Sequence, residues 1–305
     1  MSLRQRQRKI AADEGMESAE GHPGTHMNET PLQNASHVLS KDGTRIGYLS
    51  VGEGPSVLVI PGVLSVAADY AAFARALSEH FSVHTSSAGD EARAARKVMI
   101  TASSKSVRTC SRCRPRRARP FLLGTATVDW LSLEVARNNK AFKRIAVYEP
   151  GVSIDGSMPT AWMPGYEKML AEKRNLDALV EFTLADAPRG IQKTPRWLMK
   201  LILLVLISCS RQYRQMLDLL NQHLRECREI ARLDSSCEHY REIAGGVLLM
   251  YGGKSDSKAV TLAVERLAAI LPRSETREFP RLDHFGIERT APREVAKAVT
   301  DYFLK

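Results

Sequence analysis

Residues 56–60 read Ser-Val-Leu-Val-Ile, and Pro61-Gly62 follows directly. A short apolar run that stops at Pro-Gly is typical of a strand with both faces buried in a sheet. The same kind of run returns at residues 143–148 (KRIAVY) and 246–251 (GVLLMY). These stretches therefore predict a sheet whose central strands are covered on both sides.

Helical patterns separate these strands along the chain. Strands that alternate with helices argue for a mostly parallel sheet with helices on both faces. A block of mainly helical sequence, residues 151–242, interrupts the alternation and predicts a helical cap. The expected fold class is therefore α/β, with a mainly parallel sheet, helices on both faces and a cap. The other strands are expected at residues 37–40, 44–51, 81–85, 121–124 and 276–279, and the helices at residues 67–80, 131–139, 163–173, 176–184, 195–208, 211–233, 259–270 and 292–304.

The composition limits the class of protein. The chain has 305 residues, 44% of them hydrophobic and 26% charged, which excludes a wholly disordered chain and allows a sizeable core. Its five cysteines are an odd number at irregular spacings, which argues against a secreted disulfide scaffold. Residues 1–34 carry no apolar stretch behind their basic residues, so they predict a disordered tail and no secretory signal. We therefore expect a cytoplasmic protein.

The net charge is concentrated in one segment. The formal charge is +10, and residues 86–120 alone contain ten Lys or Arg against two acids. An arginine cluster can bind phosphates, but this segment has no interleaved aromatic residues and no recognisable nucleic-acid-binding module. Nucleic-acid binding is therefore the weaker alternative, and we expect no nucleic-acid partner.

These patterns divide the chain into four parts. Residues 1–34 form the tail, and residues 35–150 form the first half of the core, with the anomalous basic segment at 86–120. Residues 151–242 form the helical cap, and residues 243–305 form the second half of the core.

Two features of the sequence could indicate a metal site or a membrane segment, and neither does so. Cys110 and Cys113 form one C-x-x-C, but a structural zinc site needs four ligands and no second pair has a suitable spacing. The apolar run at residues 198–209 is about a dozen residues long and is broken by Lys200, so it is too short to span a bilayer. We expect the stripe at residues 198–206 to pack in the core or cap, with no metal and no membrane partner.

Three stretches match one chemical scheme. Residues 57–65 (VLVIPGVLS) form a strand that ends where a backbone amide can point into a cleft. Residues 247–256 (VLLMYGGKSD) form a strand and turn that end at Asp256, and residues 278–287 (EFPRLDHFGI) place His284 in a short loop after a strand. Taken alone, Asp256 is more readily interpreted as a turn aspartate, and His284 as a packed or surface histidine.

Together these stretches resemble the α/β-hydrolase superfamily, over residues 37–85 and 121–305. The resemblance implies that Asp256 is the catalytic acid, His284 the catalytic histidine and the backbone of Val63 an oxyanion-hole donor. It implies hydrolysis of a small-molecule substrate, an ester or related acyl compound, through an acyl-enzyme, with no cofactor and no metal.

The nucleophile of this scheme is missing. The family carries a serine in G-x-S-x-G, on a tight turn between a strand and a helix. Here residues 124–130 read GTATVDW, so Ala126 occupies the nucleophile position. Val128 and Asp129 stand where small residues are needed, and Ser132 falls inside the following helix without flanking glycines. The sequence therefore predicts an incomplete catalytic triad.

A change of reading frame explains both the basic segment and the missing serine. If the codons for residues 86–130 are read one nucleotide earlier, those for residues 123–130 can encode Gly-His-Ser-Tyr-Gly-Gly-Leu. The codon for Ala126 then supplies two bases of the serine codon, and that for Val128 two bases of a glycine codon. High-GC coding sequence read out of frame also yields the Arg, Ala and Ser that fill this segment. We therefore hypothesise a shifted frame.

Three functions remain open from the sequence. The first is a hydrolase for a small ester or related acyl substrate, impaired in this chain because the nucleophile serine is missing. The second is a non-catalytic relative that binds a ligand or partner; the missing serine favours it, and the retained Asp256 and His284 weigh against it. The third is a basic nucleic-acid-binding protein.

Overall fold

The computed structural model of the chain describes residues 35–39, 45–86, 120–125, 129–187, 189–255 and 257–305. Several sequence predictions lie outside these residues. They concern the tail at residues 1–34, most of the basic segment at residues 86–120, and the positions of Ala126 and Asp256.

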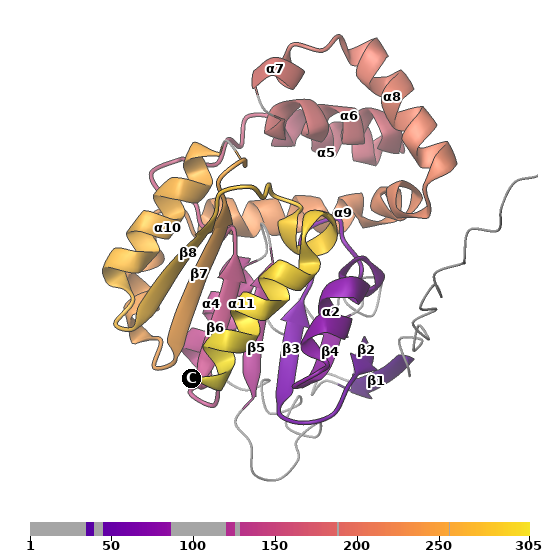
Figure 1. Cartoon of the computed structure of the whole chain (residues 1–305). Coiled ribbons are helices and arrows are strands. Elements are labelled where there is room, and N and C mark those ends of the chain that lie inside the picture. Colours follow the sequence, from indigo (N-terminus) through magenta and orange to yellow (C-terminus); the bar gives the residue numbers. More distant parts are fainter. Residues whose placement is uncertain (1–34, 40–44, 87–119, 126–128, 188, 256) are drawn as a thin grey trace, which may run out of the picture. The chain divides into compact units, whose positions relative to one another are not determined.

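The described strands form one eight-stranded sheet in the order β1-β2-β4-β3-β5-β6-β7-β8 (Figure 1). The first two pairings in this order are antiparallel, and the other five are parallel. The mainly parallel sheet predicted from the sequence is therefore confirmed. The strands are β1 (Ala35–Leu39), β2 (Arg45–Val51), β3 (Ser56–Ile60), β4 (Ser82–Ser86), β5 (Phe121–Thr125), β6 (Arg144–Tyr148), β7 (Gly246–Gly252) and β8 (Ser274–Phe279).

Helices cover both faces of the sheet. They include α2 (Ala71–Leu77), α4 (Asp129–Asn138), α10 (Lys258–Ile270) and α11 (Pro292–Leu304). In β6, Ile145 and Val147 pack in one apolar cluster with α4 and α10. Ala146 and Tyr148 pack in a second cluster with α2 and α11. Side chains alternate between the two faces of a strand, and because both faces are covered the strand reads as a continuous apolar run.

The cap is a set of helices inserted between β6 and β7 (Figure 1). They are α5 (Met163–Ala171), α6 (Asn175–Asp186), α7 (Arg189–Gln192), α8 (Arg196–Cys209) and α9 (Arg211–Arg232). These helices have an apolar core of their own, which includes Tyr166, Leu179 and Leu220. Leu64, from the turn after β3, joins this cluster and links the cap to the sheet.

One packing prediction is wrong in part. The stripe at residues 198–206 was expected to pack in the core or cap, and Met199 and Leu203 do so. Leu201 and Val205 are instead 53% and 55% exposed. The reason is that α8 is apolar on all sides, so its sequence carries no sign of which face the cap covers.

Candidate active site

The candidate site lies at the edge of the sheet where the parallel strands end. Ile60, the last residue of β3, pairs with Gly124 of β5. Thr125, the last residue of β5, pairs with Tyr148, the last residue of β6. Because the carboxyl ends of parallel strands meet at one edge, the turns that follow them come together there, and ligands of α/β sheets bind at this edge.

At this edge His284 contacts Glu149, a residue that the sequence analysis did not single out. The His284 Nδ1 lies 2.7 Å from the Glu149 Oε2. Glu149 directly follows β6 and its side chain is 1% exposed, whereas the His284 side chain is 41% exposed. A carboxylate on Nδ1 fixes the orientation of an imidazole and leaves Nε2 to exchange protons. The structure therefore places a buried carboxylate where it orients the imidazole.

Glu149 is itself held in place from several sides. Its φ of 58° lies in the left-handed region, which a non-glycine residue keeps only where its surroundings enforce it. Its backbone N–H donates to the Met250 carbonyl at 2.7 Å. The Gly252 N–H donates to its Oε1 at 3.0 Å, and the Ser255 hydroxyl donates to the same oxygen. These bonds satisfy the buried carboxylate and fix it beside the imidazole.

The signal that finds Glu149 is an acid placed directly after a buried strand. The same signal, together with the family resemblance, pointed to Asp256 after β7. Asp256 lies outside the described residues, so its role as the acid stays a prediction.

The loop that carries His284 packs directly on the end of β7. A Cβ atom at Gly252 would lie 2.6 Å from the Leu282 carbonyl oxygen, so no side chain fits at that position. The Tyr148 hydroxyl donates to the Asp283 carbonyl at 2.7 Å, and the Lys254 N–H donates to the Leu282 carbonyl at 2.8 Å. These contacts fix the loop, and with it the imidazole, relative to Glu149.

Acidic groups surround the His284 imidazole. Burial lowers its pKa, but the hydrogen bond and charge of Glu149, with the charges of Asp186 and Glu288, outweigh this effect and raise the pKa overall. Asp186 ends α6 of the cap, and Glu288 belongs to η5 (Gly286–Thr290). Because the folded pKa is raised, this interaction stabilises the fold below about pH 6.5 and is lost as the pH rises through the folded pKa.

A hydrogen-bond network joins the turn after β3 to the end of β5. The Tyr70 hydroxyl lies 3.0 Å from the Gly62 N–H and 2.7 Å from the Thr125 hydroxyl, both of which donate to it. The Tyr70 hydroxyl donates to Glu288 at 2.6 Å, and the Ser65 hydroxyl donates to the same carboxylate at 2.9 Å. Burial and the charge of Glu288 raise the pKa of Tyr70 well above its ordinary value, so its hydroxyl keeps its proton.

Val63 lies in the turn after β3, next to Gly62 of this network. Leu64, which follows it, has a φ of 56°, so the chain bends sharply here. The turn begins after Ile60, whose partner Gly124 precedes the Ala126 position by two residues. Val63 therefore lies in the turn that neighbours the elbow, and its role as an oxyanion-hole donor stays a prediction.

The residues that follow the Ala126 position bring polar groups into the core. Asp129 and Ser132 are 0% exposed, and Trp130 is 3% exposed. Within the described ranges, neither carboxylate oxygen of Asp129, nor the Trp130 Nε1, nor the Ser132 Oγ has a hydrogen bond of good geometry. A buried polar group left in this way costs about 1–3 kcal/mol. The sequence at the start of α4 is therefore poorly matched to the fold around it.

Ser132 is not a substitute nucleophile. It lies in α4 with no exposed surface, so a substrate in solution cannot reach its Oγ. It packs against β5, since a Cβ atom at Gly124 would lie 2.8 Å from the Ser132 Cβ. This agrees with the sequence prediction that Ser132 falls inside the helix and does not occupy the elbow.

The substitution Asp129→Ala is expected to stabilise the protein. Burial raises the pKa of Asp129 well above its ordinary value, the backbone of Tyr148 opposes this rise, and the charge of Glu149 adds to it. A carboxyl group with a raised folded pKa binds its proton more tightly in the folded state, so the stability of the unsubstituted chain falls as the pH rises above about 4. The expected gain is on the order of 1–3 kcal/mol near pH 7, and it shrinks below about pH 4.

Urea unfolding of the two chains near pH 7 and below about pH 4 measures this gain in stability. Asp301→Ala is the matched control, because Asp301 is exposed and pairs with Lys297 at 2.8 Å, and exposed pairs contribute about 1 kcal/mol or less. A loss of stability near pH 7 on Asp129→Ala would contradict the expected cost of burying this carboxyl group.

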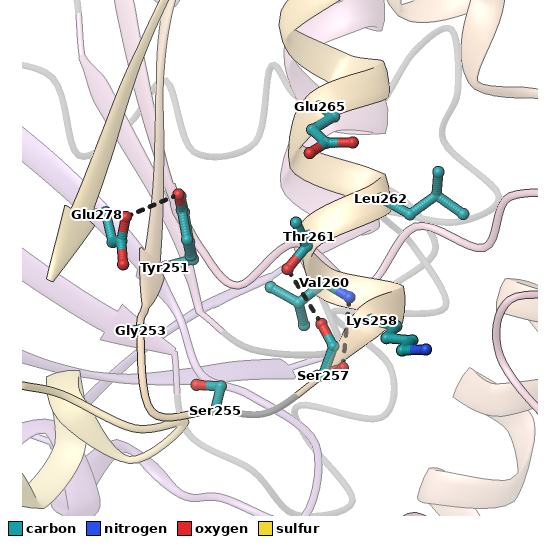
Figure 2. Close-up of a pocket in the computed structure, with 11 residues that line it drawn as sticks. Tyr251, Gly253, Ser255, Ser257, Lys258, Val260, Thr261, Leu262, Glu265 and Glu278 are labelled. Atoms are coloured by element: carbon teal, nitrogen blue, oxygen red, sulfur yellow. Dashed lines mark hydrogen bonds between the residues drawn. The ribbon is translucent and has the colours of Figure 1, made fainter. Parts of the chain in front are cut away.

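A surface groove of about 410 Å³ lies beside the end of β7 (Figure 2). It is lined by polar and apolar side chains from β7, β8, α10 and the turn before α10, among them Tyr251, Glu278 and Leu262. Figure 2 shows Ser257 capping α10, where its hydroxyl accepts from the Val260 N–H at 3.3 Å. Neither His284 nor Glu149 lines this groove, so it is not the candidate active site.

The cap contains a second buried histidine that is separate from this site. The ring nitrogens of His223 lie 3.0 Å from the Tyr166 hydroxyl and 3.2 Å from the Cys227 Sγ. Burial lowers the pKa of His223 to about 3, so the ring is neutral near pH 7 and packs as part of the cap core. In the part of the chain that the structure describes, no group of three or more His, Cys, Asp or Glu is arranged to hold a metal ion.

Comparisons with known proteins agree on the fold. No family model matches the sequence, and no curated protein is significantly similar to it. Among solved structures, an α/β hydrolase from Sphaerobacter thermophilus matches 88% of this chain and 100% of its own, with a TM-score of 0.68 and 21% identity. Naproxen esterase from Bacillus subtilis matches 90% of this chain and 92% of its own, with a TM-score of 0.56 and 12% identity.

A third solved structure gives the same result. A thermophilic esterase from Thermogutta terrifontis matches 89% of this chain and 98% of its own, with a TM-score of 0.60 and 13% identity. Similarity at such low identity extends to the fold and not to a particular activity. With the sheet order, the inserted cap and the histidine loop after the last strand, it establishes that this chain has the α/β-hydrolase fold.

Proposed function

We propose that this chain is a hydrolase of small esters or related acyl compounds whose chemistry is impaired by the loss of its nucleophile. The observation that carries the proposal is the 2.7 Å contact between His284 and Glu149. It lies at the edge of the sheet where the turn after β5, with Ala126, begins. A buried acid and an accessible imidazole are the two parts of a triad that activate a hydroxyl group.

The roles of the residues follow from this arrangement. Glu149 holds the Nδ1 proton of His284, and Nε2 accepts the proton of a hydroxyl nucleophile at position 126 as its oxygen bonds to the substrate carbonyl carbon. The same proton then passes to the leaving alcohol, whose bond to the carbonyl carbon breaks, and an acyl-enzyme remains. His284 next takes a proton from water, and the attack of that water releases the acid. Backbone N–H groups near Val63 stabilise the oxyanion in both steps.

The polar groups buried beside the elbow support the frame hypothesis. In the alternative frame the codons for Asp129 and Trp130 read as glycine and leucine, in line with serine at position 126. The carboxylate of Asp129 and the indole N–H of Trp130 are among the buried polar groups that lack a hydrogen bond of good geometry within the described residues. The alternative frame removes both the buried carboxylate and the buried indole N–H. It also supplies the glycines that the tight turn requires.

The coding DNA and an ester panel test the proposal. Codons 85–133, translated in all three frames, are expected to show an open frame with G-x-S-x-G across codons 86–130. A stop codon in that window, or arginine in place of serine at the Ala126 overlap, would remove the frame hypothesis. A chain with residues 86–130 restored from that frame is then expected to hydrolyse p-nitrophenyl esters of short acids, and His284→Ala is expected to abolish this activity.

A second candidate is a non-catalytic protein that binds an acyl ligand in the same place. The alanine at position 126 favours it, because it removes the nucleophile and leaves the site in place. The two candidates differ in the DNA. A coding sequence with no alternative open frame favours the binding protein.

A further inference from the structure

Helix α8 presents a large apolar face to solvent. Trp197 is 70% exposed, Leu201 53% and Val205 55%, and Leu204 is 44% exposed. Trp197, Leu201 and Val205 follow one another at intervals of four, and Leu204 lies three positions after Leu201, so the four residues share one face of the helix. Met199 and Leu203, on the opposite face, are buried against the cap core. A contiguous exposed apolar patch of this kind marks an interaction surface.

The chain around this face is strongly basic. Residues 187–217 contain six Lys or Arg and no acid. Arg196 and Lys200 pair with Glu181 and Asp177 of α6. Three further basic residues flank α8 in the sequence: Lys193, Arg211 and Arg214. All three are exposed, and they form no ion pair in the described part of the chain.

The combination of an apolar face and unpaired cations indicates what kind of partner binds α8. We propose that α8, with its flanking basic residues, binds the surface of an anionic lipid membrane. A helix that exposes an apolar face and has basic residues at both ends can lie in the plane of the interface, where its exposed apolar side chains enter the boundary between head groups and acyl chains. Lys and Arg add attraction to anionic head groups, and a tryptophan such as Trp197 suits this boundary, since its ring is apolar and its N–H is polar.

A second copy of the chain fits this face less well. A two-fold dimer would set the same surface against itself, and the unpaired cations at both ends of α8 would then face one another. Like charges across an interface oppose association. None of the helices in the described part of the chain has the length and apolar character to cross a bilayer. The binding mode proposed is therefore contact with one leaflet and does not depend on hydrolase activity.

Vesicle binding of the full chain tests the proposal. Co-sedimentation with phosphatidylcholine vesicles that contain phosphatidylglycerol is compared with pure phosphatidylcholine. Binding is expected on the anionic vesicles, and it is expected to weaken at high salt. Trp197 is the exposed tryptophan of the three in the chain, so its fluorescence is expected to shift to the blue on binding, and Trp197→Phe is expected to remove that shift.

Paired variants separate α8 from the rest of the chain. The double variant Leu201→Ser, Val205→Ser is expected to weaken binding at least about tenfold, because two apolar side chains no longer enter the lipid. Leu262→Ser and Leu304→Ser change exposed leucines elsewhere, 40% and 58% exposed, and are expected to leave binding unchanged. Far-UV circular dichroism confirms that each variant is folded.

Three outcomes would overturn the proposal. The first is no binding to anionic vesicles. The second is binding that the double variant leaves intact, which would assign it to another segment such as the basic one. The third is a dimer in sedimentation equilibrium that Leu201→Ser, Val205→Ser dissociates, which would assign α8 to an interface between two copies.

Discussion

The chain as written is expected to hydrolyse short p-nitrophenyl esters about 10⁶-fold more slowly than the chain restored over residues 86–130, because loss of a triad nucleophile has an effect of this size. In the proposed mechanism His284 is the base and Glu149, in contact with it, the orienting acid, but Ala126 offers them no hydroxyl to activate. Steady-state kinetics on the two chains measure the ratio.

Ala126→Ser alone is the informative control for this prediction. It supplies a hydroxyl but leaves Val128 and Asp129, which obstruct the tight turn, so it is expected to restore little activity. Robust turnover by the unmodified chain would contradict the prediction, and its loss on Ser132→Ala would show that the nucleophile had been misplaced.

In the restored chain, Glu149→Gln is expected to lower kcat about 10⁴-fold, the order of effect found when the orienting acid of a triad becomes an amide. A neutral amide does not stabilise the charged imidazole, and its NH2 group can donate to Nδ1, which selects the wrong tautomer of the ring. The kcat of the two chains, measured at saturating substrate, gives the effect.

Asp256→Asn is the matched variant for this prediction. If Glu149 is the orienting acid, Asp256→Asn is expected to change kcat by less than about tenfold. A large loss on Asp256→Asn with little effect of Glu149→Gln would return the role to Asp256, as the sequence and the family resemblance predicted.

The sequence predicted the strands and helices well because buried segments show a recognisable pattern of apolar residues. The strand at residues 56–60 was predicted with the bounds that β3 has, and the predicted strand at residues 246–251 differs from β7 by one residue. Both runs are apolar throughout because helices cover both faces of the sheet. The helix predicted at residues 67–80 is divided in the structure into η1 (Ala67–Tyr70) and α2 (Ala71–Leu77). Apolar spacing does not separate these two helix types.

The site was harder to predict, because contacts between distant turns leave no local pattern. Glu149 and His284 are 135 residues apart in the sequence, and the pairings of β6 with β7 and of β7 with β8 bring them together. The same limit applies to α8, whose exposed face depends on which side α6 and α9 cover. A pattern in the sequence shows that a residue is apolar, but not which neighbour covers it.

The pKa of His284 in the chain as written, followed by NMR of its imidazole proton, tests the central claim most directly, because it needs no activity. We expect a pKa above about 6.5, since Glu149 stabilises the charged ring. We expect Glu149→Gln to lower that pKa and Asp256→Asn to leave it unchanged, with His284→Ala used to assign the signal. A pKa at or below about 6.5 that does not respond to Glu149→Gln would contradict the pairing of these two residues.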